Sequence, residues 1–151
     1  MVPLIDLKIQ HRSIASEIEA AIKNVCDNTA FILSDEMKSF ENEFASYCGA
    51  KHGIGVANGT EALFLALVAL GVGEGDEVIV PANTFIATAE AVSHAGAIPV
   101  FVDVDPQTYC MDPSKIGGAI TARTKVVMPV HLYGHPADMD AITSVARNSG
   151  L

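Results

Sequence analysis

The residues best suited to chemistry in this 151-residue chain form the turn Asn58-Gly59-Thr60, which separates two apolar runs. Residues 53–57 before it are typical of a buried strand, and residues 60–70 after it are typical of a buried helix. Ligands of parallel α/β sheets bind beyond the carboxyl ends of the strands, where the first N–H groups of a helix can hold an anion. Glycine permits close approach, and the Thr60 hydroxyl adds a donor. The turn therefore predicts a phosphate site, with simple N-capping by Asn58 or Thr60 as the alternative.

A second candidate is Phe85, which follows the next strand-like run, residues 77–80. Its position after that strand predicts that the ring lies at the same edge of the sheet as the turn. A phosphorylated planar ligand needs an anion site and a flat apolar surface, and Thr60 and Phe85 would supply both. Packing of Phe85 into the core at the start of a helix is the alternative interpretation.

The elements that must position these residues alternate along the chain. Strands are expected over residues 53–57, 77–80, 98–104 and 125–132. Helices are expected from residue 12 or 13 to about 25, over 34–47, 60–70 and 85–94, from 112 for a short stretch, and over 136–148. Strands rich in Val and Ile that alternate with helices predict an α/β domain with a mostly parallel sheet and flanking helices.

Composition and charge argue against several classes of partner. Half of the residues are hydrophobic and 18% are charged, which is typical of a globular chain. The 9 basic and 18 acidic residues give a net charge of −9 without a basic stripe, so neither nucleic acid nor an anionic membrane is expected as a partner. The N-terminus lacks a signal-peptide pattern and no apolar run reaches the roughly 18 residues of a membrane span, so a soluble cytoplasmic protein is expected.

The cysteines and histidines do not form a metal-binding pattern. The three cysteines lack CxxC spacing, which favours buried free thiols; they are Cys26, Cys48 and Cys110. His131 and His135 are four residues apart, but a glycine and a proline interrupt any helix through them. No metal site is expected.

The turn at residues 58–60, the segment around Phe85 and further segments along the chain together resemble the DegT/DnrJ/StrS group of sugar aminotransferases, which use pyridoxal phosphate (PLP). The matching segments keep the family's order along nearly the whole chain, at residues 2–7, 40–41, 44–45, 58–63, 75–79, 84–88, 96–97, 99–103, 129–134 and 137–140. The resemblance implies the aspartate aminotransferase type of fold. Residues 1–151 would be the N-terminal segment and part of the large PLP-binding domain, truncated, with the small C-terminal domain absent.

The resemblance also implies roles for four cofactor-binding residues. The turn that holds the cofactor phosphate in the family corresponds to Gly59 and Thr60, with Asn58 where many relatives have serine. The aromatic ring that stacks on the pyridine corresponds to Phe85. Ser34 stands where many relatives have glycine, close to the substrate side.

No catalytic residue of the family is expected within this chain. The resemblance places the Schiff-base lysine, and the carboxylate that protonates the pyridine nitrogen, beyond residue 151. None of the six lysines has the family's lysine context, and all are expected at the surface; they are Lys8, Lys23, Lys38, Lys51, Lys115 and Lys125. The chain would represent about the first two-fifths of a family member, bind PLP weakly or not at all, and be inactive alone.

The implied reaction of the intact enzyme moves an amino group from an amino acid, expected to be glutamate, to a keto-sugar on a nucleotide. Such enzymes serve cell-surface polysaccharide biosynthesis, and family members are homodimers with active sites at the subunit interface. Two alternatives stay open at this point. One is a same-fold lyase or dehydratase with another substrate, and the other is a truncated non-catalytic module that binds phosphate or a partner.

Overall fold

The computed structural model describes residues 5–151, so residues 2–4 of the first family-like segment lie outside the described part. The chain divides into two compact units, Met1–Gly55 and Val56–Leu151. Each unit has its own pattern of burial and is described separately.

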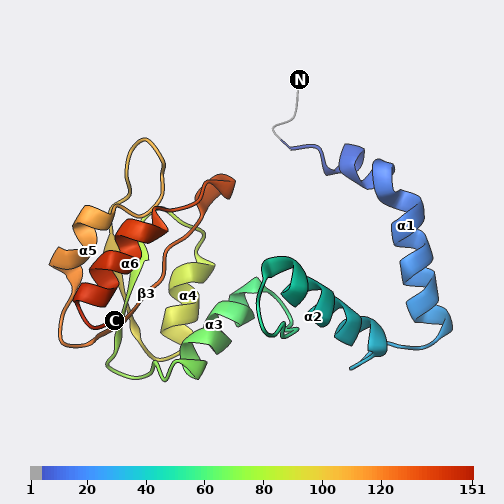
Figure 1. The fold of residues 1–151 in the computed structure, drawn as a ribbon, viewed down its shortest axis with the longest axis horizontal. Coiled ribbons are helices and arrows are strands. Elements are labelled where there is room, and N and C mark those ends of the chain that lie inside the picture. Colours follow the sequence, from blue (N-terminus) through green and yellow to red (C-terminus); the bar gives the residue numbers. More distant parts are fainter. Residues whose placement is uncertain (1–4) are drawn as a thin grey trace. The chain divides into compact units, whose positions relative to one another are not determined.

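The second unit contains a three-stranded parallel sheet (Figure 1). Its strands are β1 (Glu77–Pro81), β2 (Ile98–Val102) and β3 (Thr124–Val127), in the order β2-β1-β3. Every residue of the central strand β1 is buried, as expected for a parallel strand covered on both faces. The predicted α/β class with a mostly parallel sheet is confirmed.

Helices cover both faces of this sheet. Side chains alternate along β1, so Val78 and Val80 share one cluster with α3 (Gly59–Ala69) and α4 (Ala87–His94). Ile79 belongs to the other cluster, with Ile116 of α5 (Pro113–Ala119) and Ile142 of α6 (Met139–Asn148). The second unit is therefore a three-layer arrangement with a core on each side of β1.

Several predicted boundaries in this unit are corrected. The strand expected over 98–104 ends at Val102, and Val104 forms an isolated antiparallel bridge with Met111. The strand expected over 125–132 ends at Val127, because Met128 donates a last backbone bond to Ile79 and the following Pro129 has no N–H.

Two helices begin later than expected. Helix α6 begins at Met139 because the Asp138 carboxylate caps it, accepting from the Ala141 amide at 3.0 Å. Helix α4 begins at Ala87 after a turn at Ile86. A tight turn at Leu132–Gly134, in which Tyr133 has a left-handed conformation, lies between β3 and α6.

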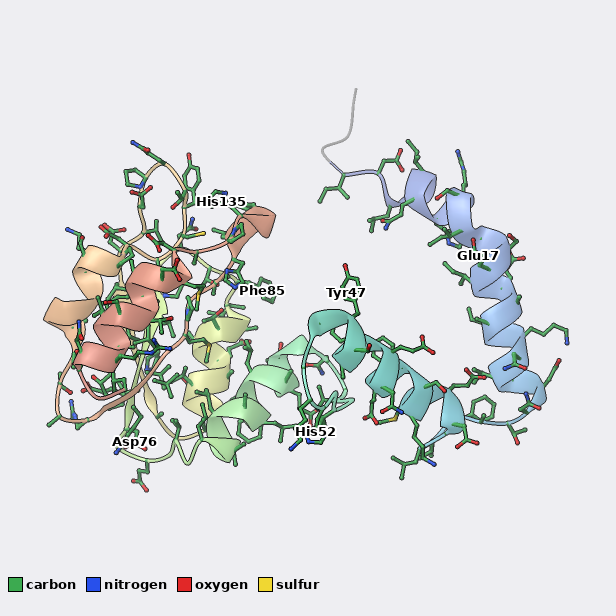
Figure 2. All side chains as sticks on the ribbon, in the orientation of Figure 1. Glu17, Tyr47, His52, Asp76, Phe85 and His135 are labelled. Atoms are coloured by element: carbon green, nitrogen blue, oxygen red, sulfur yellow. The ribbon has the colours of Figure 1, made fainter. Side chains whose placement is uncertain are left out.

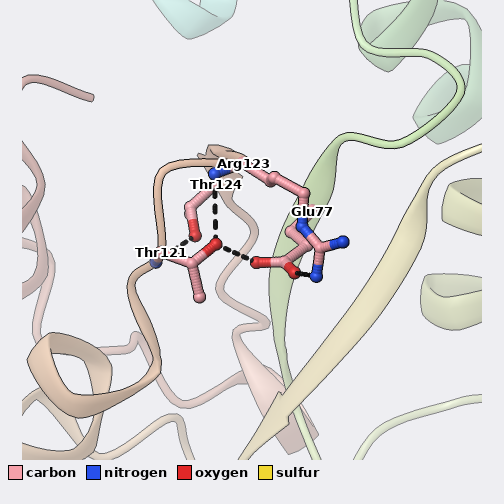
Figure 3. A network of polar contacts seen from close by, with 4 residues as sticks. All are labelled: Glu77, Thr121, Arg123 and Thr124. Carbon is pink, nitrogen blue, oxygen red and sulfur yellow. Dashed lines mark hydrogen bonds and ion pairs between the residues drawn. The ribbon is translucent and has the colours of Figure 1, made fainter.

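A buried carboxylate joins β1 to the segment before β3 (Figure 3). Glu77 accepts from the Thr121 hydroxyl and pairs with the Arg123 guanidinium, while the Thr121 amide donates to Thr124 Oγ1 at 2.9 Å. These bonds, that of Thr121 first, hold the pKa of Glu77 below its usual value, although burial opposes the shift. This network fixes the amino ends of two neighbouring strands.

The first unit consists of two helices, α1 (Leu7–Asp27) and α2 (Asp35–Cys48). Helix α1 begins earlier than predicted because the Asp6 carboxylate accepts from the Lys8 amide at 3.0 Å and so caps it. Helix α2 keeps its predicted ends, capped by Ser34 and followed by the left-handed Gly49. Although α1 is long, no helix of residues 5–151 is long and apolar enough to cross a membrane.

The strand predicted over residues 53–57 is wrong. Its amides donate to carboxylates rather than to a neighbouring strand: Gly55 to Glu41 at 2.7 Å and Ala57 to Glu61 at 3.2 Å. A Cβ on Gly53 would lie 2.4 Å from the Glu41 carbonyl oxygen. Glycine at 53 therefore allows the backbone to approach α2, a contact that an apolar run alone does not reveal.

The thiols and lysines can also be compared with expectation. Cys110 is buried, but Cys26 and Cys48 are exposed on the first unit, so the expectation of buried thiols is wrong for these two. Cys26 lies in the last turn of α1 and Cys48 is the last residue of α2, and both side chains lie outside any core. All six lysines are exposed, as expected.

Candidate functional site

The turn before α3 forms a reciprocal cap. Asn58 is extended, and its Oδ1 accepts from the Glu61 amide at 2.9 Å. Glu61 in turn accepts from the Ala57 amide at 3.2 Å. This is a capping box in which asparagine takes the usual Ser or Thr place. The capping interpretation is thus correct for Asn58, and the Asn-x-x-Glu spacing was the signal for the role of Glu61.

The cap leaves two donors at the helix start. Gly59 and Thr60 occupy the first two helical positions, whose amides have no acceptor within the helix. The helix dipole places partial positive charge there, worth roughly 0.3–1 kcal/mol for a neighbouring anion. Glu61, the acid of this first turn, opposes that field in part. The arrangement can still accept an anionic group through backbone donors.

Glycine at position 59 has no explanation within the chain. Gly59 is not among the glycines with positive φ, and a Cβ built on it meets nothing within 4 Å. Neither backbone conformation nor packing therefore requires glycine there. Open space in front of an N-terminal amide is what a bound phosphate needs, so the residues present fit a phosphate group.

A hollow of about 520 Å³ adjoins this helix start. Its lining residues come from α3 and the end of α4; they are Asn58, Thr60, Glu61, Phe64 and His94. His94, at the end of α4, is exposed. Nothing local in the sequence links His94 to Thr60, because their proximity results from the packing of α4 beside α3.

Phe85 lies two residues before α4 and is 74% exposed (Figure 2). Its carbonyl accepts from the Thr88 amide at 3.1 Å, which fixes the backbone of this first turn. Core packing, the alternative interpretation of Phe85, is therefore wrong. Phe85 is not among the residues that line the hollow, so joint contact of Phe85 and Thr60 with one ligand stays a prediction.

His131, considered above as a metal ligand, and two aspartates of the second unit have structural roles in turns and caps. His131 Nδ1 accepts from the Ala137 amide at 3.0 Å, which is a structural role. Backbone amides of Thr108 and Gln107 lower the pKa of Asp105, and Ser114 lowers the pKa of Asp112 through hydroxyl and amide donors. Within residues 5–151 there is no group of three or more His, Cys, Asp or Glu side chains that could hold a metal ion.

Fold and site together define a helix-flanked parallel α/β protein with open amide donors at the start of α3. Residues 12–151 match the model of the DegT/DnrJ/EryC1/StrS aminotransferase family. The chain belongs to this family, which confirms the resemblance and the aspartate aminotransferase type of fold.

Similar proteins include dTDP-3-amino-3,4,6-trideoxy-alpha-D-glucose transaminase of Streptomyces venezuelae, 49% identical over 99% of this chain and 40% of the relative. UDP-2-acetamido-2-deoxy-3-oxo-D-glucuronate aminotransferase of Pseudomonas aeruginosa is 48% identical over 100% of this chain and 42% of the relative. The chain thus spans about two-fifths of the length of these relatives.

Solved structures agree with this assignment. The crystal structure of S. venezuelae DesV matches with a TM-score of 0.95 and 49% identity, over 99% of this chain and 40% of that one. The structure of NtdA from Bacillus subtilis, solved with its cofactor PMP, matches with a TM-score of 0.94 and 38% identity, over 99% of this chain and 35% of that one.

Proposed function

We propose that this chain is the N-terminal part of a PLP-dependent aminotransferase that moves an amino group from an amino acid to a nucleotide-linked keto-sugar. Relatives named for UDP-linked and dTDP-linked sugars support this substrate class. We take glutamate as the donor and a homodimer as the working assembly. Residues 1–151 would supply the N-terminal segment and part of the large domain.

The observation that carries the proposal is the unexplained glycine at the start of α3. Gly59 has free space in front of it, and the capping box leaves the amides of Gly59 and Thr60 open. We assign the cofactor phosphate to these amides and the Thr60 hydroxyl. Phe85, exposed two residues before α4, would stack on the pyridine ring.

The cofactor supplies the electron sink that amino transfer needs. The residues of this chain would bind its phosphate and orient its ring. All six lysines are exposed, and none lines the hollow beside Thr60. We therefore propose that the covalent attachment and the proton transfers depend on residues outside this chain.

The binding assignment is tested by titrating the chain with PLP and, separately, with inorganic phosphate. Amide NMR shifts of Gly59 and Thr60 report the contact directly. Gly59→Ala should weaken phosphate binding without a loss of stability, because its methyl group meets no protein atom and would occupy the space that we assign to the phosphate. Gly117→Ala on α5, which also meets nothing within 4 Å, is the matched control. Unmoved Gly59 and Thr60 amides at saturating phosphate would contradict the assignment.

We expect the chain alone to have no aminotransferase activity. Incubation with PLP, glutamate and a keto-sugar nucleotide should yield no amino-sugar, because groups that act as a unit cannot be removed in part without losing nearly the whole rate. Borohydride reduction followed by mass analysis should show no stoichiometric adduct. An adduct at one lysine, together with product, would show that the active site lies within these residues.

A same-fold enzyme with another substrate is the second candidate. It is favoured by one relative, 3-amino-5-hydroxybenzoate synthase of Amycolatopsis mediterranei, which is 53% identical over 78% of this chain and 30% of the relative. Its name contains no nucleotide. Binding of a nucleoside diphosphate to this chain would favour the nucleotide-sugar assignment over this one.

A further inference from the structure

Each of the three segments that leave the carboxyl edge of the sheet carries an exposed aromatic ring. Phe85 follows β1, Tyr109 follows β2 at 52% exposure, and Tyr133 follows β3 at 83%. Because the strands are parallel, these segments all begin at the same edge, where ligands of such sheets bind. The proposed function uses Phe85 and leaves the two tyrosines without a role.

The two tyrosines meet although their strands do not. Strands β2 and β3 lie on opposite sides of β1 in the sheet. Nevertheless the rings of Tyr109 and Tyr133 are 6.3 Å apart between centroids, with an interplanar angle of 72°. The segments after β2 and β3 therefore converge beyond the end of β1. Figure 2 shows Phe85 and His135, two residues after Tyr133, on the same side of the second unit.

Both tyrosines have a backbone conformation that side chains disfavour. Tyr109 has φ of 60° and Tyr133 has φ of 56°, in the left-handed region. Burial does not compensate, since both rings are exposed. Unfavourable conformations of this kind persist where the surrounding structure holds them, and they cluster at ligand sites.

Hydrogen bonds hold the two segments in place. The Tyr109 amide donates to the Asp105 carbonyl at 2.8 Å, which closes its turn. The Cys110 thiol donates to the His135 carbonyl at 3.3 Å and so ties one segment to the other. The two segments that carry the tyrosines are therefore held to each other by a hydrogen bond.

A hollow of about 210 Å³ lies between the same two segments. Asp105 and Thr108 line it from one segment, and His135 and Asp138 line it from the other. Both carboxylates use Oδ1 to accept backbone amides of their own turns. Their Oδ2 atoms can accept from a ligand that carries N–H donors.

Tyr109 and Tyr133 are not among the residues that line this hollow, but they lie on the same two segments. We propose that the two rings stack on the base of the nucleotide carried by the substrate, and that the carboxylates of the hollow accept from the edge of that base. This inference rests on the proposed function. A nucleobase has a flat face for an aromatic ring and N–H groups for a carboxylate oxygen. Stacking accepts any base, so the site should bind uracil, thymine and guanine nucleotides with similar affinity.

The test is calorimetric or NMR titration of the chain with UDP, dTDP and GDP. Tyr133→Asn removes the ring, and asparagine tolerates the left-handed conformation, so this variant should fold. We expect it to weaken binding about tenfold or more, as does loss of a stacked aromatic in other proteins. Tyr109→Ala should do the same. Tyr47→Ala, which removes a ring 88% exposed on α2, is the control and should change nothing.

The chemical source of binding is separated by competition. Uridine should displace UDP from the wild-type chain, whereas inorganic diphosphate should displace it only weakly. Equal displacement by diphosphate, unchanged binding by both tyrosine variants, or no nucleotide binding by the wild-type chain would each overturn the proposal. A change in sedimentation with Tyr133→Asn at unaltered nucleotide affinity would assign the pair to contacts between copies and also overturn it.

The phosphate test keeps this inference distinct from the proposed function. Tyr133→Asn should leave the response of the Gly59 and Thr60 amides to inorganic phosphate unchanged. If those amides respond while the tyrosine variants bind nucleotide normally, the base site fails and the cofactor assignment stands. If they do not respond while nucleotide binding depends on Tyr133, the cofactor assignment fails.

Discussion

The two units of this chain differ in how much of their apolar surface they bury. The second unit holds two core clusters, with Val78, Ile79 and Val80 fully buried between helices. In the first unit, α1 has no buried residue and α2 has only Ala45. Large apolar side chains of the first unit stay exposed, among them Ile22 at 59% and Phe44 at 52%.

The difference shows that helix formation and core formation have separate sources. Helices α1 and α2 are delimited by local caps, which need only neighbouring residues. Isolated helices below about 12–15 residues, a range that includes α2, are marginal in water, and most helical stability in proteins comes from packing. The second unit has that packing on both faces of its sheet, and the first unit has exposed aromatic neighbours such as Phe40 and Phe44, stacked 5.5 Å apart.

The largest expected effect is a core truncation in the second unit. Ile79→Ala should lower the free energy of unfolding by about 2–5 kcal/mol, because Ile79 is fully buried on the central strand. The matched substitution Ile22→Ala on α1 should stay within about 0.5 kcal/mol, because its side chain is exposed. Urea denaturation followed by circular dichroism measures both. Equal losses would abolish the contrast between the units.

A steric test addresses the first unit. In Gly53→Ala the new Cβ would lie 2.4 Å from the Glu41 carbonyl oxygen, so the backbone must move, at about 1–3 kcal/mol. Hydrogen exchange of the Gly55 amide, which donates to Glu41, should accelerate. Gly49→Ser adds a side chain where no atom lies within 4 Å. Its effect therefore reports only the backbone strain of a serine at the left-handed φ of 65°. Unaltered Gly55 protection in Gly53→Ala would mean that residues 53–55 are not held against α2.

The buried carboxylate predicts acid sensitivity in the second unit. Bonds from Thr121 and then Arg123 lower the pKa of Glu77 in the folded state. The resulting stabilisation is complete above the unfolded value of about 4.3 and is lost as pH falls through the lower folded value. Glu77→Gln should therefore flatten the fall in stability below about pH 4 relative to wild type.

A surface carboxylate provides the comparison for Glu77. Asp35 pairs with Lys38 at 3.3 Å, but its side chain is 99% exposed. Asp35→Asn should follow the wild-type pH profile, since exposed pairs contribute little. Unfolding midpoints in urea across the acid range decide the matter, and a profile of Glu77→Gln parallel to wild type would refute the role of the network.

The smallest expected effect separates stability from binding at the start of α3. Gly59→Ala should raise the free energy of unfolding by about 0.4–1 kcal/mol, because alanine restricts the unfolded chain and meets no atom in the folded one. Gly96→Ala should have the opposite sign, since φ there is 81° and backbone atoms of Glu74 lie 3.5 Å away. Thermal unfolding of both variants measures this difference.

Elements defined by local signals were predicted well. Ser34 and Gly49 set the ends of α2, and Asn58 sets the start of α3, because a cap involves residues within about four positions. The segment 53–57 was predicted wrongly for the converse reason. Its apolar residues suit a strand, but strand formation requires a neighbour, and its amides bond to Glu41 and Glu61 instead.

The sequence by itself determined the βα alternation, the turn Asn58-Gly59-Thr60 and the family to which the chain belongs. Only the tertiary structure decided that Glu77 meets Arg123 across 46 positions, that Phe85 stays exposed, and that Tyr109 meets Tyr133. The physical reason is the distance along the sequence over which each effect acts. Propensity and capping act between near neighbours, whereas these contacts exist because parallel strands bring the ends of distant segments to one edge of a sheet.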